Sequence, residues 1–291
     1  MSNTNKLLSY ETWVHAVSGA TGSVIAMATF YPLDTVRQRL QLSSTDQKAE
    51  STIKEMQKLI ANEGVRTLYQ GMSPVLQSLC ASNFIYFYTF HGLKRMLGTE
   101  STAIKDLLVG SVAGIINVLV TSPLWVVNTR LKSSPQPFRT LTEGLVYIGK
   151  NEGRSGLWAG LLPSLLLVSN PAIQFMTYET VKRKLNAAYG DMPAITYFLV
   201  GALAKAVATV TTYPLQLAQT RLRHGGNTAK KTNMITLIYN ILKTNGIIGL
   251  YKGLEAKLLQ TILTAALMFA AYEKIAIFVL TILRAKIKQH K

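Results

Sequence analysis

Acidic residues and cysteine are scarce in this 291-residue sequence, and each shortage excludes a class of protein. Charged residues make up 15% of the chain, against roughly 25% in an average soluble domain. The single cysteine, Cys80, excludes an internal disulfide framework and a cysteine-rich metal site, and we expect it to be a small buried apolar residue. Only 14 residues are acidic while 31 are Lys or Arg, which gives a net charge of +17. This imbalance leaves a nucleic-acid binder or a membrane protein that handles anions.

Long apolar stretches decide between these two classes. Crossing a bilayer takes roughly 20 apolar residues, and six stretches with no charge or a single one approach or exceed that length. Long and short charged segments alternate between them, which predicts three helical hairpins. We therefore expect a multi-pass protein in the lipid bilayer, with no nucleic acid as a partner. The six stretches cover residues 12–33, 67–93, 107–129, 155–178, 192–220 and 258–272.

One ten-residue pattern occurs three times at a fixed spacing. It reads YPLDTVRQRL, SPLWVVNTRL and YPLQLAQTRL, and its prolines, Pro32, Pro123 and Pro214, lie 91 residues apart. A second pattern follows each copy after a loop, as NEGVRTLYQG, NEGRSGLWAG and TNGIIGLYKG. A fixed period of this size indicates repeated structural units. The sequence thus predicts a single domain, residues 1–291, with pseudo-threefold symmetry and repeats at approximately 10–98, 101–189 and 192–283.

These patterns resemble the mitochondrial carrier family. Its signature is a proline, an acid and two bases at the end of each odd-numbered helix, followed by a loop with a Glu-Gly turn. The resemblance covers nearly the whole chain and implies an all-α membrane protein with six transmembrane helices, in three tandem repeats of about 91 residues with short surface helices in the long loops. It also implies one central binding site that is reached through two alternating gates.

The first gate, on the matrix or lumen side, is where this sequence departs from the family pattern. In the family each proline kinks its helix, and the charges beyond it pair between repeats. Asp34 and Arg37 keep both charges in the first repeat, but the equivalent positions in the other repeats are uncharged. We expect Asp34 to meet Asn128, and Arg37 to meet Gln216, so that no complete ion pair remains and the gate opens easily. Trp125 would meet Gln219. A tryptophan in this acid position resembles the pattern of carriers of nucleotides and nucleotide-like cofactors. The gate residues are Asp34, Arg37, Trp125, Asn128, Gln216 and Gln219, and the kinks are expected at Pro32, Pro123 and Pro214.

The second gate, on the cytosolic side, follows aromatic residues on the even-numbered helices. The resemblance gives Glu179 and Glu273 as its acids, and Lys94 and Lys182 as its bases. Two positions of this pattern lack a charge, so this gate is also partial. The alternative is that these four residues are solvated helix ends.

Lys205 is the strongest single candidate for a residue that binds substrate. It lies inside a long apolar stretch, where an ammonium costs on the order of 3 kcal/mol unless it faces water or a partner such as a phosphate. The alternative is a lysine whose head reaches the membrane surface. The repeat period places Asn117 one turn further along the same helix face. The resemblance adds contacts on the even-numbered helices, including Leu166 and Leu167 as an apolar surface for a nucleobase. The expected set is Ser78, Asn117, Leu166, Leu167, Asn170, Lys205, Lys257, Gln260 and Thr261.

Four further stretches resemble the peroxisomal carriers of this family: NFIYFYTF, SPLWVVNTRLK, NPAIQFMTYE and YKGLEAKLLQTILTAALM. This resemblance implies an antiporter that exchanges CoA, FAD, NAD and adenine nucleotides across the peroxisomal membrane. Its substrates would be small phosphorylated anions, and the machinery that imports peroxisomal membrane proteins is a further partner. The alternatives are a peroxisomal ATP/AMP exchanger, a nucleotide, NAD or folate-type carrier of the mitochondrial inner membrane, and an assembly protein without transport. We expect no enzyme, prosthetic group or metal site, because neither a nucleophile–base pair nor a metal-ligand cluster stands out.

Overall fold

The computed structural model is helical over most of the residues that it describes, which are 27–43, 51–96, 102–133, 136–225, 233–264 and 266–267. A first helix covers residues 27–42, and a last helix begins at residue 254. Between them lie α2 (Thr52–Glu63), the 3₁₀ helix η1 (Val65–Tyr69), α3 (Met72–Met96), α4 (Ala103–Ser133), α5 (Leu141–Asn151), α6 (Gly153–Leu157), α7 (Leu161–Leu166), the 3₁₀ helix η2 (Leu167–Ser169), α8 (Asn170–Tyr189), α9 (Ala194–His224) and α10 (Met234–Leu250).

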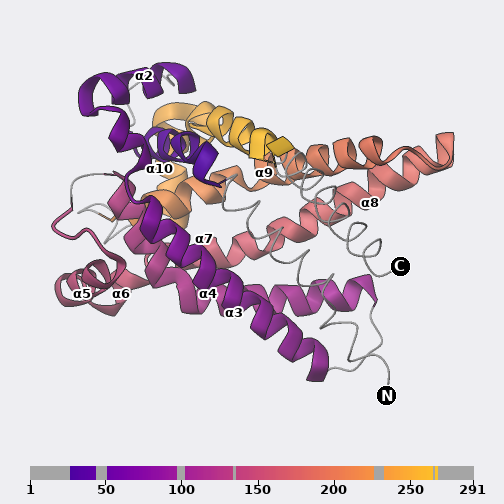
Figure 1. Cartoon of the computed structure of the whole chain (residues 1–291), viewed down its shortest axis with the longest axis horizontal. Coiled ribbons are helices and arrows are strands. Elements are labelled where there is room, and N and C mark those ends of the chain that lie inside the picture. The colour runs from indigo at the N-terminus through magenta and orange to yellow at the C-terminus, as the bar shows by residue number, and fades with distance from the viewer. Residues whose placement is uncertain are drawn as a thin grey trace, which may run out of the picture.

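Two long helical hairpins form the body of the molecule. Helix α3 packs along α4, and α8 packs along α9. The hairpins lie close together at one end of the bundle and diverge toward the other end (Figure 1). Within the described residues, three helical stretches are long and apolar enough to cross a membrane: Ile104–Ser133, Gly153–Tyr189 and Ala194–His224. The predicted crossing at 67–93 corresponds to α3, and parts of the first and last predicted crossings lie outside the described residues.

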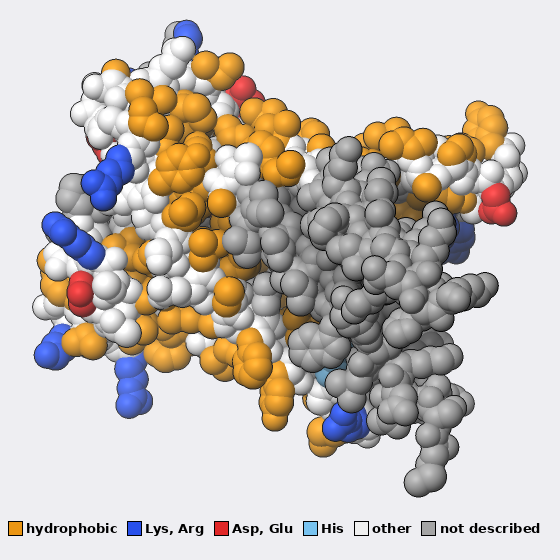
Figure 2. All heavy atoms as spheres, in the orientation of Figure 1, with side chains coloured by type: hydrophobic (Ala, Val, Ile, Leu, Met, Phe, Trp, Pro, Cys, Tyr) orange, Lys and Arg blue, Asp and Glu red, His pale blue; other side chains and the backbone are white. Residues whose placement is uncertain are grey.

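The surface of the bundle is apolar along its flanks. Hydrophobic side chains cover the flanks, whereas charged side chains lie mainly at the two ends (Figure 2). This distribution suits helices that face lipid, because charges are costly at the centre of a bilayer. Cys80 is exposed on α3, so the expectation that it is buried is wrong. The reason is that a bilayer accepts a small apolar side chain on an outer helix face.

Surface helices α2, α5 and α10 occupy the three long loops and gather at one end of the bundle (Figure 1). This end is called the surface-helix end below. Each of these helices packs on the last turns of the long helix that begins its repeat, which is the helix 27–42 for α2, α4 for α5 and α9 for α10. A small apolar core is closed at each contact. Representative members are Val36 with Leu59, Val127 with Ile148, and Leu217 with Ile241.

Glycines of the second repeated pattern explain part of its recurrence. Gly64, Gly153 and Gly246 all have positive φ, at 82°, 72° and 64°. This conformation is strained for a residue with a side chain but not for glycine. Gly64 follows α2 directly, Gly153 follows α5 after one residue, and Gly246 is the non-helical residue inside α10, so a glycine redirects the chain in all three repeats.

The side-chain contacts repeat with the sequence. The hydroxyl of Tyr31 donates to the carbonyl of Gln70 at 3.0 Å, and the hydroxyl of Tyr213 donates to the carbonyl of Lys252 at 2.9 Å. These two bonds join equivalent positions of the first and third repeats. The predicted repetition of structure is therefore confirmed at the level of single contacts.

Pro123 and Pro214 lie inside α4 and α9, and both helices continue past them. A proline leaves the carbonyl four residues earlier without its helical partner. For Pro123 that carbonyl belongs to Leu119, and it accepts the indole N–H of Trp158 at 2.9 Å. Trp158 is part of the second repeated pattern, so one pattern satisfies a group that the other leaves open.

Candidate functional site

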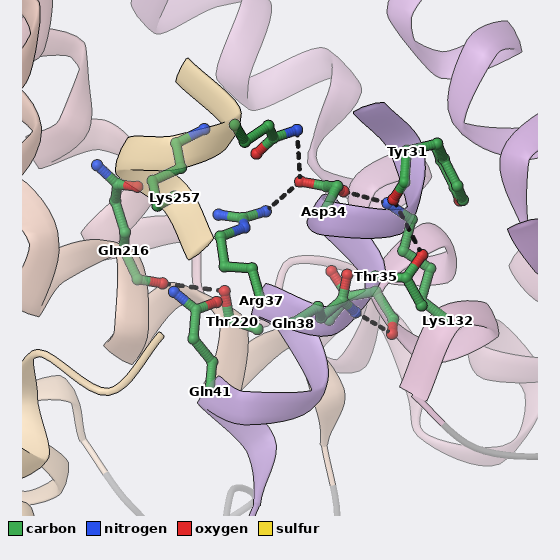
Figure 3. A network of polar contacts seen from close by, with 12 residues as sticks. Tyr31, Asp34, Thr35, Arg37, Gln38, Gln41, Lys132, Gln216, Thr220 and Lys257 are labelled. Carbon is green, nitrogen blue, oxygen red and sulfur yellow. Dashed lines mark hydrogen bonds and ion pairs between the residues drawn. The ribbon is translucent and has the colours of Figure 1, made fainter. Parts of the chain in front are cut away.

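Asp34 is the centre of a polar cluster at the surface-helix end of the bundle (Figure 3). Lys132 of α4 forms a buried ion pair with its Oδ2. Arg37 donates to Oδ1 from one turn further along the same helix at 2.7 Å, and Gln260 approaches the same oxygen at 3.4 Å. Asp34 thus connects the helix 27–42 with α4 and with the helix that begins at residue 254.

The expectation that no complete ion pair remains at the first gate is wrong. Asn128, the predicted partner of Asp34, forms no hydrogen bond through either amide atom among the described residues. Lys132 lies one turn beyond Asn128 on the same face of α4, and its longer side chain reaches the carboxylate. Its ammonium also lies over the ring of Tyr31, 4.2 Å from the centroid. The base that is missing at position 128 is therefore supplied from position 132.

The remaining residues of the first gate bond to other partners than expected. Trp125 donates its indole N–H to Ser82 at 3.2 Å, and Gln219 donates to Ser164 at 2.8 Å. Gln216 donates to a threonine one turn earlier in α9 at 3.2 Å, within its own helix. Trp125, Gln216 and Gln219, which each replace a charge of the family pattern, thus bond to hydroxyl groups.

Hydrogen bonds to backbone carbonyls also join the repeats at this end, and no sequence pattern predicted them. They link the first repeat to the second, the second to the third and the third to the first. In the last two bonds the donor is the second base of the repeated ten-residue pattern. The bonds run from Gln38 to Thr129 (2.6 Å), from Arg130 to Arg223 (3.2 Å) and from Arg221 to Gln41 (2.9 Å).

The second base of the pattern also pairs with the glutamate of the NEG sequence. Arg39 bonds to Glu63 at 3.0 Å, and Arg130 holds Glu152 through two bonds at 2.6 and 2.9 Å. In the third repeat Asn245 replaces the glutamate. These pairs tie the helix 27–42 and α4 to their surface segments, which explains why the two patterns occur together in the first two repeats.

A second polar cluster lies further along the bundle, around Lys205. This residue is about 16 Å from the first residue of α9 at the usual helical rise. Its Nζ lies 3.4 Å from Oδ1 of Asn170, the first residue of α8. The amide nitrogen of Asn170 donates in turn to Thr212 at 2.8 Å and to the carbonyl of Ala208 at 3.2 Å. The structure thus brings together Lys205 and Asn170, two of the predicted substrate-site residues.

Four other predicted substrate-site residues lie on α3, α4 and the broken helix before α8. The Oγ of Ser78 and the Oδ1 of Asn117 are buried and have no hydrogen-bond partner among the described residues. Leu166 is 44% exposed, and Leu167 is half-buried at the start of η2. One hydroxyl and one amide oxygen of the predicted set thus lack a partner among the described residues, and they belong to different helices.

The last three predicted substrate-site residues, on the helix that begins at 254, lie nearer to the first gate. Gln260 contacts Asp34 directly, and Lys257 lies beside Arg37 in the same network (Figure 3). Thr261 donates to the backbone carbonyl of Lys257 at 2.7 Å, within its own helix. The gate cluster is thus continuous with part of the predicted substrate site.

The described residues of the second gate bond locally. Lys94 forms an ion pair with Asp106 at 2.9 Å, within the α3–α4 hairpin. Lys182 lies over two tyrosine rings, 5.7 and 5.6 Å from their centroids. Glu179 is half-buried on α8, and Glu273 lies outside the described residues. The two ends of the bundle therefore differ, because the ion pair at the surface-helix end joins the helix 27–42 to α4, which are not consecutive, whereas the ion pair at the other end joins the consecutive helices α3 and α4.

Three helical repeats with polar clusters inside an apolar bundle, and an ion pair between repeats at one end, define a membrane transport protein. The family described as mitochondrial carrier protein matches the chain three times, over residues 9–101, 99–188 and 190–282, and the chain belongs to this family. The predicted resemblance is confirmed.

Its relatives include peroxisomal proteins. Mouse peroxisomal membrane protein PMP34 is 49% identical over 96% of this chain and 97% of its own length. The peroxisomal nicotinamide adenine dinucleotide carrier of Arabidopsis thaliana is 32% identical over 90% of this chain and 94% of its own length. Peroxisomal adenine nucleotide carrier 1 of Glycine max is 32% identical over 91% of both. The chain is accordingly a multi-pass transporter of the peroxisomal membrane and not an enzyme.

Proposed function

We propose that this chain exchanges phosphorylated adenine-containing cofactors, namely CoA, FAD, NAD, AMP and ATP, across the peroxisomal membrane. Two of the relatives are by name carriers of NAD and of adenine nucleotides. The observation that carries the proposal is Lys205, a cation inside an apolar helix that contacts the neutral amide of Asn170 and forms no ion pair among the described residues. A phosphate group is the complementary ligand for such an ammonium.

In this proposal Lys205 and Asn170 bind a phosphate group of the substrate. Leu166 and Leu167 supply an apolar surface for the adenine ring. The hydroxyl, amide and ammonium groups of the remaining predicted residues contact the polar parts of the substrate. Those residues are Ser78, Asn117, Lys257, Gln260 and Thr261.

Transport proceeds by alternating access between the two gates. The first gate is held closed by the Asp34–Lys132 pair and by the carbonyl bonds between repeats. The second gate closes when Lys94 and Lys182 pair with Glu179 and Glu273, the acids of that gate. Substrate binding supplies the free energy for the transition, because the substrate binds the intermediate arrangement more tightly than it binds either state with one gate closed.

The test is counter-exchange by the purified protein in liposomes. Uptake of labelled CoA, FAD, NAD, ATP and pyrimidine nucleotides is measured in liposomes with internal AMP and in empty ones. We expect uptake of the adenine cofactors only where AMP is present inside. Uptake that is restricted to ATP would establish an ATP/AMP exchanger instead. No uptake of any compound by folded protein would overturn the proposal and favour the assembly-protein alternative.

A further inference from the structure

The cavity at the first gate has more positive charge than its one acid neutralises. It has a volume of about 320 Å³, at the small end of the range for ligand pockets, and it lies between the helix 27–42, α3, α4 and α9. Its charged lining consists of Asp34 and three bases, Arg37, Lys132 and Arg223. Three bases against one acid leave an excess of two positive charges within the described lining.

Buried donors in the wall of this cavity lack partners. Asn128 is 2% exposed, and neither its amide nitrogen nor its amide oxygen has a partner among the described residues. The Nε atoms of Arg37 and Arg223 are likewise buried and unpartnered within the described part of the chain. Unpaired buried donors are costly, and cationic ones more so. A negatively charged ligand that accepts several hydrogen bonds would satisfy the three N–H donors, namely Nδ2 of Asn128 and the Nε atoms of Arg37 and Arg223.

We propose that the gate cavity is a second anion-binding site, which holds a phosphate group of an extended substrate while another part of the substrate lies at Lys205. This proposal rests on the proposed function and deepens it. Lys205 itself does not line the cavity, and Gln216, which does, lies about 16 Å further along α9 at the usual helical rise. Only an elongated molecule, such as a dinucleotide or CoA, reaches both positions.

The second site also gives the substrate a means of opening the gate. Arg37 and Lys132 are both bound to Asp34 in the closed gate. A phosphate that enters the cavity competes with this carboxylate for the same two cations. Its binding therefore weakens the ion pair between the repeats, which is the differential interaction that a transition between two states requires.

The test is the thermal stability of the purified full-length protein with inorganic pyrophosphate. The wild type is expected to be stabilised by pyrophosphate, and Arg223→Gln and Asn128→Leu are each expected to weaken its apparent affinity about tenfold, the effect of losing one charge-assisted hydrogen bond. Arg223→Lys, which retains the charge, should keep part of the affinity. The matched control is Arg154→Gln, which removes an exposed arginine at the same end of the molecule.

Two results would overturn the second site. One is no stabilisation of the wild type by pyrophosphate. The other is a loss of affinity in Lys205→Gln alone, which would assign the anion to the central cluster. Failure of the proposed function is distinguishable, because pyrophosphate binding needs no transport. If transport also occurs, Arg223→Gln is expected to lower the uptake of NAD and CoA more than the uptake of AMP.

Discussion

Lys132 reaches Asp34 from one helical turn beyond Asn128, the residue at the base position of the repeated pattern. Overlay of the repeats compares side chains at identical positions, so it predicted an amide where the structure has a cation. A lysine side chain spans the distance between neighbouring turns, and three- and four-residue steps share a helix face. The repeated pattern thus singled out Asp34, but its partner depends on side-chain reach.

We predict that Lys132→Gln lowers the thermal stability of the protein. Removing one partner of a buried ion pair costs up to about 3–5 kcal/mol, and Arg37 offsets part of this loss because it stays bound to Asp34. The double variant Asp34→Lys with Lys132→Asp is expected to be more stable than Asp34→Lys alone. Thermal unfolding in detergent measures both effects, with the exposed Lys150→Gln as the control. A double variant no more stable than Asp34→Lys alone would contradict the pairing.

At the scale of helices, two of the predicted apolar stretches end before the helices they belong to. The stretch 107–129 lies within α4, which ends at Ser133, and the stretch 192–220 lies largely within α9, which ends at His224. Hydropathy ends a membrane segment at its first charges. Here those charges stay in the helix because Lys132, Arg130 and Arg221 bond to neighbouring repeats.

The fourth stretch, 155–178, contains several elements instead of a single helix. Gly160 has a φ of 73° and precedes α7, and the 3₁₀ turn η2 separates α7 from α8. The glycine and the Asn170–Pro171 pair are the sequence signals of these breaks. The turn places Asn170 opposite Lys205, a contact that the apolar pattern alone did not predict.

A double-mutant cycle tests whether Trp158 satisfies the carbonyl that Pro123 leaves open. We predict that Trp158→Phe destabilises the protein by about 1 kcal/mol, because the carbonyl of Leu119 loses its partner. In a Pro123→Ala background the backbone N–H of residue 123 can bond to that carbonyl, so the same substitution should cost much less. Thermal or denaturant unfolding of the four proteins measures the coupling. Equal effects in both backgrounds would show that the indole has another role.

At the scale of the whole molecule, the 91-residue period predicted the three repeats, and the family resemblance predicted the surface helices. Neither the period nor the resemblance predicted how unevenly charge is distributed over the repeats. One acid, Asp34, faces bases from three repeats in the gate cavity. This arrangement depends on which side chains converge at the axis, and a repeat pattern specifies equivalence rather than distance. The Asp34–Lys132 pair and the Lys94–Asp106 pair are for the same reason findings of the structure.

In the proposed exchange, Lys205 inside the bundle binds a phosphate group of the substrate. The most direct measurement is the initial rate of NAD uptake into AMP-loaded liposomes for the wild type, Lys205→Gln and Lys184→Gln. Lys184 is an exposed lysine of α8 and serves as the matched control. We predict a rate at least about tenfold lower for Lys205→Gln, because one charge-assisted bond to phosphate is lost. The rate for Lys184→Gln is expected to be near the wild-type value. Equal rates for Lys205→Gln and the wild type would contradict the prediction.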